Sequence, residues 1–119
     1  MKFYNHSNNK VKIAELITDH LLLTNLDNAV DLLGNLYYQG FESLIIHQNQ
    51  LSPEFFDLKT GLAGDILQKF SNYRIRLAVV GNFSEFNSKS LKDFIYECNQ
   101  GRQIAFVATK NEALTVLST

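Results

Sequence analysis

The run Arg76-Leu77-Ala78-Val79-Val80 is apolar at four successive positions and is followed by a glycine. A strand with one face in water alternates apolar and polar residues, whereas a parallel strand covered on both faces is apolar throughout. The run is also short and contains valine, a β-branched residue that is enriched in strands. It therefore predicts a buried strand of a parallel sheet.

Similar apolar runs recur along the chain, over residues 11–17, 43–47 and 104–108. The segments between them have the 3.6-residue period of amphipathic helices, over residues 26–39, 52–72 and 89–100, and a short helix is expected after Asn111. This alternation predicts a single α/β domain with a mostly parallel sheet of four or five strands, packed against helices.

The first run differs from the others because Lys12 and Glu15 interrupt its apolar pattern. The interruption predicts an edge strand, and residues 1–10 before it are expected to be disordered or loosely attached. The segment Leu21-Leu22-Leu23 fits either a second strand, paired with the first through a turn, or the approach to the first helix.

The composition argues against several classes of protein. The chain has 119 residues, enough for one core, and its eleven basic and twelve acidic residues give a net charge of −1, which does not attract nucleic acid. Cys98 is the only cysteine, so the chain has neither an internal disulfide nor paired cysteines for zinc. Residues 1–10 lack the apolar core of a signal peptide, and no apolar run approaches the ~20 residues that span a bilayer. We therefore expect a cytoplasmic protein that binds neither nucleic acid nor membrane.

The expected second helix contains the most unusual residues of the chain. Ser52 is placed to cap it, and Pro53 occupies its first position, where a missing N–H has no cost. In an unbroken helix, Lys59 lies in the middle of the apolar face. A lysine there must shed water, so we expect its ammonium to contact a carboxylate, such as Glu15 or Glu85, or a bound anion.

Gly61 and Gly64 fall together on the outer face of the same expected helix. Each glycine costs roughly 1 kcal/mol relative to alanine, and glycines three apart leave a smooth surface that another backbone can approach. We interpret this surface as a contact for a protein partner or for a second copy of the chain in a homodimer.

Polar residues follow the predicted strands, at the edge of a parallel sheet where ligands usually bind. These residues are His47-Gln48-Asn49, Gly81-Asn82 and Thr109-Lys110, with Ser52, Asp57 and Lys59 on the helix after the second run. For His47 we favour a structural role, because no second histidine lies at ligand spacing, and we expect no metal and no other cofactor. The chain has no G-x-G-x-x-G or Walker motif and no nucleophile elbow.

Several segments resemble a small bacterial family known as domain of unknown function 4180. The resemblance extends from about residue 11 to residue 114 and is carried by Asp31-Leu32-Leu33-Gly34-Asn35, Phe55-Phe56-Asp57-Leu58-Lys59-Thr60-Gly61-Leu62-Ala63-Gly64, Ile66-Leu67-Gln68-Lys69-Phe70, Leu77-Ala78-Val79-Val80-Gly81 and Ser90-Leu91-Lys92-Asp93-Phe94-Ile95-Tyr96-Glu97. It implies a small bacterial α/β protein and no particular activity. In this family an acidic residue often follows the strand-end glycine, where this chain has Asn82.

The order of the expected elements also resembles the STAS fold of anti-sigma-factor antagonists, in which a regulatory serine begins the second helix. Ser52 holds that position, but Leu51 and Pro53 replace the residues that flank the serine in the STAS pattern. The resemblance therefore implies the architecture and not regulation by phosphorylation. A flavodoxin-like three-layer sandwich is the alternative architecture.

We predict a non-enzymatic binding or regulatory module. The alternative is a small enzyme or ligand-binding protein with an anion-binding pocket at the carboxyl ends of the strands, in which Lys59 acts with His47 or Asp57. A deep pocket around Lys59 would favour the alternative, and a filled core with a flat surface around the two glycines would favour the module.

Overall fold

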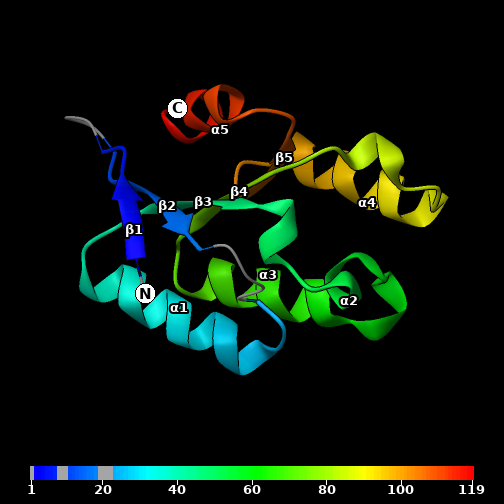
Figure 1. The fold of residues 1–119 in the computed structure, drawn as a ribbon, viewed down its shortest axis with the longest axis horizontal. Coiled ribbons are helices and arrows are strands. Elements are labelled where there is room, and N and C mark those ends of the chain that lie inside the picture. The colour runs from blue at the N-terminus through cyan, green and yellow to red at the C-terminus, as the bar shows by residue number, and fades with distance from the viewer. Residues whose placement is uncertain (1, 8–10, 19–22) are drawn as a thin grey trace.

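The structure is a computed structural model that describes residues 2–7, 11–18 and 23–119. Within these residues, five strands form one sheet in the order β1-β2-β3-β4-β5 (Figure 1). They are β1 (Lys2–Asn5), β2 (Ile13–Ile17), β3 (Ser43–His47), β4 (Arg76–Val80) and β5 (Ile104–Val107). β1 runs antiparallel to β2, and each later strand runs parallel to its neighbour, which confirms the predicted mostly parallel sheet.

Of the helices that connect the parallel strands, the first two cover one face of the sheet and the third lies along its β5 edge, whereas the last helix of the chain covers the other face (Figure 1). The connecting helices are α1 (Leu26–Tyr38), α3 (Leu62–Asn72) and α4 (Lys89–Gln100), and the last helix is α5 (Lys110–Leu117). From β2 onward, each strand lies next to the strand that precedes it in the chain, and the order always advances in the same direction across the sheet. Right-handed crossovers therefore keep the connecting helices on the same side of the sheet. None of the helices in the described part of the chain combines the length and the apolar character needed to cross a bilayer.

The order of the strands tests the flavodoxin-like alternative. Flavodoxin-like sheets have the order 2-1-3-4-5. The observed order follows the chain and has an antiparallel strand at one edge, so the flavodoxin-like alternative is wrong.

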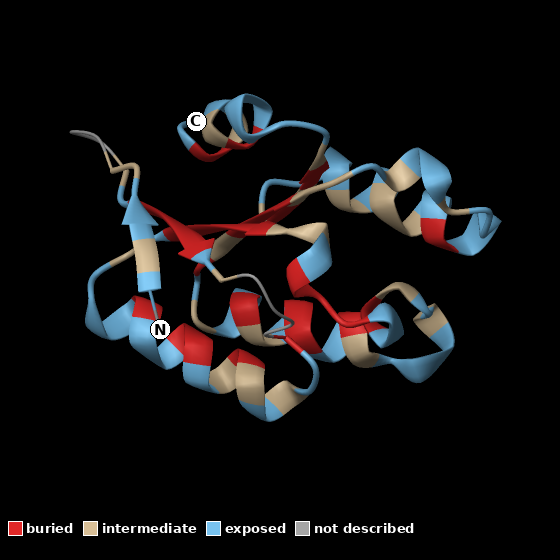
Figure 2. Ribbon diagram, viewed as in Figure 1, coloured by how far each residue is buried: buried red, intermediate tan, exposed pale blue. Residues whose placement is uncertain are grey.

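The two faces of the sheet have separate apolar cores, because side chains alternate along each strand. Leu44 and Ile46 of β3 belong to the larger core under the crossover helices, whereas Ile45 belongs to the smaller core with Ala113 and Leu117 of α5. Buried residues accordingly follow the sheet and the inner sides of the helices (Figure 2). Since α5 contacts mainly β3, β4 and β5, the β1 side of this face is less covered.

On this side of the sheet the edge strand is β1, and the prediction that the run over residues 11–17 forms an edge strand is wrong. Residues 2–5, expected to be loosely attached, are paired with β2, and Phe3 packs on the larger core. In the segment Leu21-Leu22-Leu23, the first two residues lie outside the described residues. Leu23 is buried and forms an isolated parallel bridge with Leu51.

The prediction of a single helix over residues 52–72 is wrong, because this segment is divided into three elements. The structure has a short helix α2 (Pro53–Phe56), then a 3₁₀ turn η2 (Leu58–Thr60), and then α3. Gly61 joins the last two elements, lies outside α3 and therefore does not share a helix face with Gly64.

Side chains in the connecting turn explain the break. The hydroxyl of Thr60 donates to the carbonyls of Glu54 and Asp57, at 2.8 and 2.9 Å. The Asp57 carboxylate accepts the N–H of Lys59 at 3.2 Å. Threonine and aspartate that bond nearby backbone groups in this way compete with a helix, and the left-handed φ of +75° at Gly61 then turns the chain.

Truncation of Ile66 tests the packing of α3. Ile66 is fully buried in the larger core, whereas Leu62, four residues earlier, is only partly buried. We expect Ile66→Ala to lower the free energy of unfolding by about 2–5 kcal/mol, and Leu62→Ala to lower it by clearly less, in urea titrations. Equal losses for the two variants would show that α3 packs through a different face.

The two glycines are expected to respond in opposite directions to alanine. Gly61→Ala places a side chain at positive φ and should lower the free energy of unfolding by about 1 kcal/mol. At Gly64, an exposed position in α3, an added Cβ meets nothing within 4 Å, so Gly64→Ala should raise that free energy by roughly 0.5–1 kcal/mol. Thermal unfolding measures both variants, and shifts of the same sign would contradict the assigned break.

Candidate functional site

Glu15 lies in the middle of β2, and only 10% of its side chain is exposed. It shares a face with Ile13, two residues earlier, because alternate residues of a strand point the same way. Ile13 belongs to the apolar core under α5. A carboxylate in such surroundings is costly unless charged or hydrogen-bonding partners compensate.

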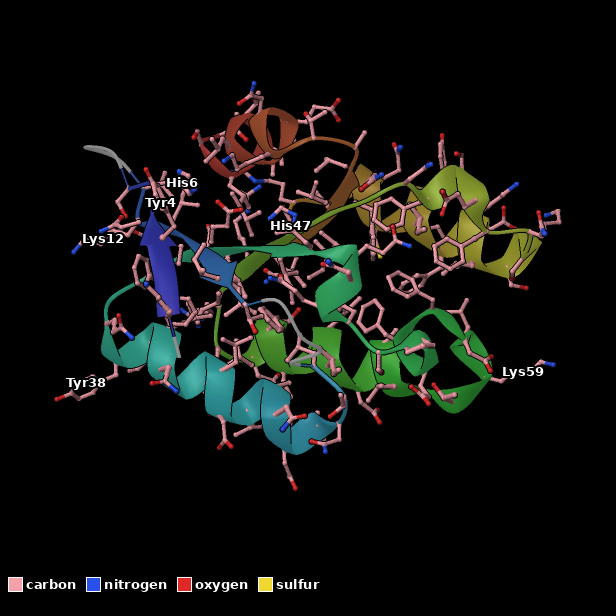
Figure 3. The ribbon with its side chains drawn as sticks, in the orientation of Figure 1. Tyr4, His6, Lys12, Tyr38, His47 and Lys59 are labelled. Carbon is pink, nitrogen blue, oxygen red and sulfur yellow. The ribbon has the colours of Figure 1, made fainter. Side chains whose placement is uncertain are left out.

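Three side chains from other elements surround this carboxylate. Nε2 of His6 lies 2.7 Å from Glu15 Oε1, and Nε2 of His47 lies 2.6 Å from Glu15 Oε2. Nζ of Lys110 lies 3.9 Å from Oε1. We call His6, Glu15, His47 and Lys110 the Glu15 cluster; Figure 3 labels its two histidines, which come from the β1 side and the β3 side of β2.

Local structure positions each member of the cluster. His6 follows β1 and continues its pairing, since its N–H donates to the carbonyl of Ile13 at 2.8 Å. His47 is the last residue of β3, the strand next to β2 on the other side. Lys110 is the first residue of α5, after the cap residue Thr109, and so lies beyond the carboxyl end of β5.

A buried amide holds the end of β3 beside β2. Gln50 belongs to the short 3₁₀ turn η1 (Gln48–Gln50) that follows β3. Its Oε1 accepts the N–H of His47 at 2.8 Å, and its Nε2 donates to the carbonyls of Leu16 and Thr18 at 3.1 and 3.2 Å. These bonds fix the backbone of His47 relative to β2 and so place its ring next to the carboxylate.

The hydrogen-bonding pattern determines which ring nitrogens carry protons. An ionised carboxylate only accepts hydrogen bonds, so each Nε2 carries the proton that it donates to Glu15. The remaining nitrogen, Nδ1, accepts a hydrogen bond or a proton when the ring is neutral, and donates when the ring is protonated. His47 is the more accessible histidine, with 34% of its side chain exposed against 14% for His6.

Opposing effects act on the pKa of Glu15. Burial raises the pKa, whereas the hydrogen bonds from His47 and His6 and the charges of Lys110 and His47 lower it. The lowering effects are larger in sum, and the pKa of Glu15 lies below its ordinary value of 4.5. The carboxylate is therefore ionised at neutral pH.

The arrangement brings two imidazoles and an ammonium to one carboxylate. Each imidazole hydrogen-bonds its own carboxylate oxygen, and in the described residues no group of three His, Cys, Asp or Glu could hold a metal ion. What the cluster offers is two titratable rings and an ammonium on a partly open surface.

The predicted site residues do not all converge on this place. His47 and Lys110, both predicted at strand ends, meet in the Glu15 cluster. Lys59 and Asp57 lie instead on the exposed tip between α2 and α3, and Figure 3 shows Lys59 pointing outward, well away from His47. No ion pair of Lys59 occurs among the described residues, so its predicted contact with a carboxylate of the chain is wrong; anion binding by Lys59 stays a prediction.

Ser52 and Asn82 also lie outside the cluster. Ser52 is the cap residue of α2, with Pro53 after it as predicted, but its buried hydroxyl makes no capping bond. Asn82 follows β4, where its N–H donates to Gln48 Oε1 at 3.0 Å and its Nδ2 donates to Glu85 at 3.2 Å. These bonds give Asn82 a structural role in the turn.

Sequence reasoning missed His6 and assigned Glu15 to the wrong partner. The signal for Glu15 is its place inside the apolar strand Ile13–Ile17, where a buried charge requires partners. The signal for His6 is the aromatic pair Phe3-Tyr4 followed by serine and asparagine residues, which together with the next apolar run fits a β-hairpin.

The lowered pKa of Glu15 predicts a loss of stability in acid. A carboxyl whose pKa is lower in the folded state contributes stability above its unfolded pKa, and loses it as the pH falls through the folded value. We expect the free energy of unfolding to fall as the pH drops below about 5, and Glu15→Gln to be about 1–3 kcal/mol less stable than wild type at pH 7, with a flatter profile in acid. Urea titrations across this range measure both effects.

Glu42→Gln provides the control, because Glu42 is an exposed glutamate whose side chain lies outside the cluster. An equal flattening of the acid profile in this variant would show that the effect does not belong to Glu15.

Comparison with known proteins identifies the family of this chain. The family model described as a domain of unknown function (DUF4180) matches residues 8–117, nearly the whole chain. We found no match among curated proteins or among solved structures. The resemblance noted in the sequence is confirmed, and the chain belongs to the family defined by the domain of unknown function DUF4180.

Proposed function

We propose that this protein is a non-enzymatic binding module of the cytoplasm that holds a small anionic ligand at the Glu15 cluster. The observation that carries the proposal is the shared carboxylate. Glu15 engages Nε2 of each imidazole, so a ligand would meet the other side of the rings and the ammonium of Lys110, where the backbone N–H of Gln50 also faces the His47 side chain.

An anion at this place would receive hydrogen bonds from several donors. When both imidazoles are protonated, each Nδ1 carries a hydrogen that Glu15 does not use. Lys110 is 48% exposed and adds the donors of its ammonium. It is also the first residue of α5, and the N-terminal end of a helix carries a positive partial charge.

Protonation of the histidines sets the charge of the cluster. With both rings neutral, the charges of Glu15 and Lys110 cancel, whereas protonation of the rings leaves the cluster positive. Because an anion is attracted to the protonated form, its binding draws protons onto the rings and its affinity rises as the pH falls.

The proposed anion site lies at the carboxyl ends of the strands, as predicted from the sequence, but the lysine that binds the anion is Lys110 and not Lys59. Lys110 lies beside two further groups that become donors on protonation. Lys59 lines a half-open pocket of about 510 Å³ together with Asp57, whose carboxylate would repel an anion. Lys59 therefore serves as the comparison lysine.

We propose further that the binding module has a regulatory role, and the support for this role is the architecture of the fold. Two strands at the beginning of the chain are followed by alternating helices and strands, the order that resembles the STAS fold, and the STAS-like assignment stays a prediction supported by this order. The proposal does not include phosphorylation of Ser52, because that residue is only 3% exposed.

One observation favours a second function, general base catalysis. A buried carboxylate that holds Nε2 of a partly exposed imidazole supports a general base at Nδ1, and Glu15 and His47 have this relation, although the His47 side chain also faces the backbone N–H of Gln50. In the described residues, however, no serine, threonine or cysteine side chain hydrogen-bonds His47. Such an enzyme would act on an acidic proton of its substrate, whereas the proposed module returns its ligand unchanged.

Titration with inorganic phosphate tests the proposal. We expect the NMR signals of the His6 and His47 rings to shift on addition of phosphate at pH 6, and the Kd to be at least about tenfold weaker at pH 8. Lys110→Met should weaken binding at pH 6 about tenfold, the effect of one charged hydrogen-bonding group. Lys59→Met removes the same charge elsewhere and should leave the Kd unchanged.

Equal losses in the two lysine variants would show a general effect of net charge and would refute the cluster as the site. The absence of any shift of the ring signals at high millimolar phosphate would refute the anion ligand itself. Hydrolysis of a nitrophenyl ester that is lost in His47→Gln would favour the second function.

A further inference from the structure

We infer that a second copy of the chain binds along the outer edge of β1, so that two sheets join into one across a two-fold axis. This inference is independent of the proposed ligand. The two edge strands of an open sheet present unpaired N–H and C=O groups that another strand can pair. In this protein the two edges differ.

The β5 edge is closed by a side chain. Asn99 of α4 donates from Nδ2 to the carbonyl of Phe106 at 3.1 Å, and its Oδ1 accepts the N–H of Phe106 at 2.7 Å. A carboxamide presents the same donor and acceptor as a peptide unit, so Asn99 occupies the place of a further strand. Another chain can pair with Phe106 only by displacing α4.

The β1 edge is open in the described part of the chain. The register of β1 on β2, and the bond from the N–H of His6 to the carbonyl of Ile13, show which residues face β2. Backbone polar groups alternate in direction along a strand, so Tyr4 and His6 bond β2, whereas Phe3 and Asn5 point their N–H and C=O groups outward. No described residue pairs with these outward groups.

Exposed large apolar side chains occur on the β1 side of the molecule. They include Tyr4 of β1, Ile17 of β2 and Tyr38 at the end of α1, which are 58%, 42% and 91% exposed; Tyr96 on α4 is exposed elsewhere. Figure 3 shows Tyr4 and Tyr38 on the same side of the molecule, away from Lys59. Tyrosine is enriched at protein–protein contacts, which favours a protein at this edge.

The pattern of free groups on β1 suits a second copy of the same strand. Two copies related by a two-fold axis pair antiparallel, and pairing Phe3 with the partner's Asn5 uses the outward groups of both residues in each copy. Tyr4 then lies opposite the partner's Tyr4, at the axis. Because the β5 edge is blocked, the contact closes as a dimer and does not extend into a filament.

A cysteine pair tests the edge and the register together. In a Cys98→Ser background, Tyr4→Cys is expected to form a disulfide-linked dimer under mild oxidation, because facing residues of this kind have Cα atoms about 4.5 Å apart. Lys2→Cys in the same background is the matched control: it is exposed on the same face of the same strand, but lies opposite the partner's His6. Equal cross-linking by the two variants, or none by Tyr4→Cys, would overturn the inference.

Sedimentation distinguishes this edge from the glycine surface predicted from the sequence. We expect a dimeric wild type, a monomeric Asn5→Pro, which lacks the outward N–H, and a dimeric Asn5→Ala, which keeps it. Gly64→Leu should leave the dimer intact. A monomeric wild type at high micromolar concentration, or a monomer produced by Gly64→Leu, would contradict the proposed interface. Circular dichroism checks that Asn5→Pro is folded, and the cysteine pair decides the question if it is not.

Discussion

One carboxylate joins three strands that are otherwise held together mainly by backbone pairing, by apolar contacts and by the amide of Gln50. Glu15 lies in β2, and its two oxygens accept hydrogen bonds from His6 beyond β1 and from His47 at the end of β3. Hydrogen bonds to charged groups contribute roughly 1.5–3 kcal/mol each, and removing the partners of a buried charge costs several kcal/mol. The attachment of the N-terminal strand therefore depends on the ionisation of a residue in its neighbour.

The topology of the sheet explains why His47 and Lys110, beside this buried carboxylate, remain partly exposed. Because the strands follow one another across the sheet in chain order, the crossover helices all lie on the same side of the sheet. In the described residues the opposite face is covered by α5, a helix of 8 residues that lies mainly over β3, β4 and β5. The cluster thus occupies the part of a sheet face that its helix is too short to cover, and the proposed site follows from incomplete coverage.

Much of the fold could be predicted from the pattern of apolar residues along the sequence. Buried parallel strands are apolar on both faces, so they stand out from the amphipathic helices between them. The apolar pattern correctly predicted β3, β4 and β5, and it placed His47 and Lys110 at the same end of the sheet. It failed at Asp57 and Thr60, whose side chains bond nearby backbone groups and end a helix that periodicity alone would continue. Lys59 was assigned to an apolar face for this reason. The meeting of His6 with Glu15 depends on the register of a hairpin, which no local pattern contains.

The two hydrogen bonds between Asn99 and Phe106 have a consequence for folding during synthesis of the chain. The two residues are only seven positions apart, so α4 and β5 can form this contact without any distant part of the chain. Incompletely folded chains aggregate when strand edges are exposed, and here the last strand is masked by the helix that leaves the ribosome just before it. The outward groups of Phe106 can thus be covered as soon as β5 is made, whereas pairing with β2 leaves the outer edge of β1 uncovered.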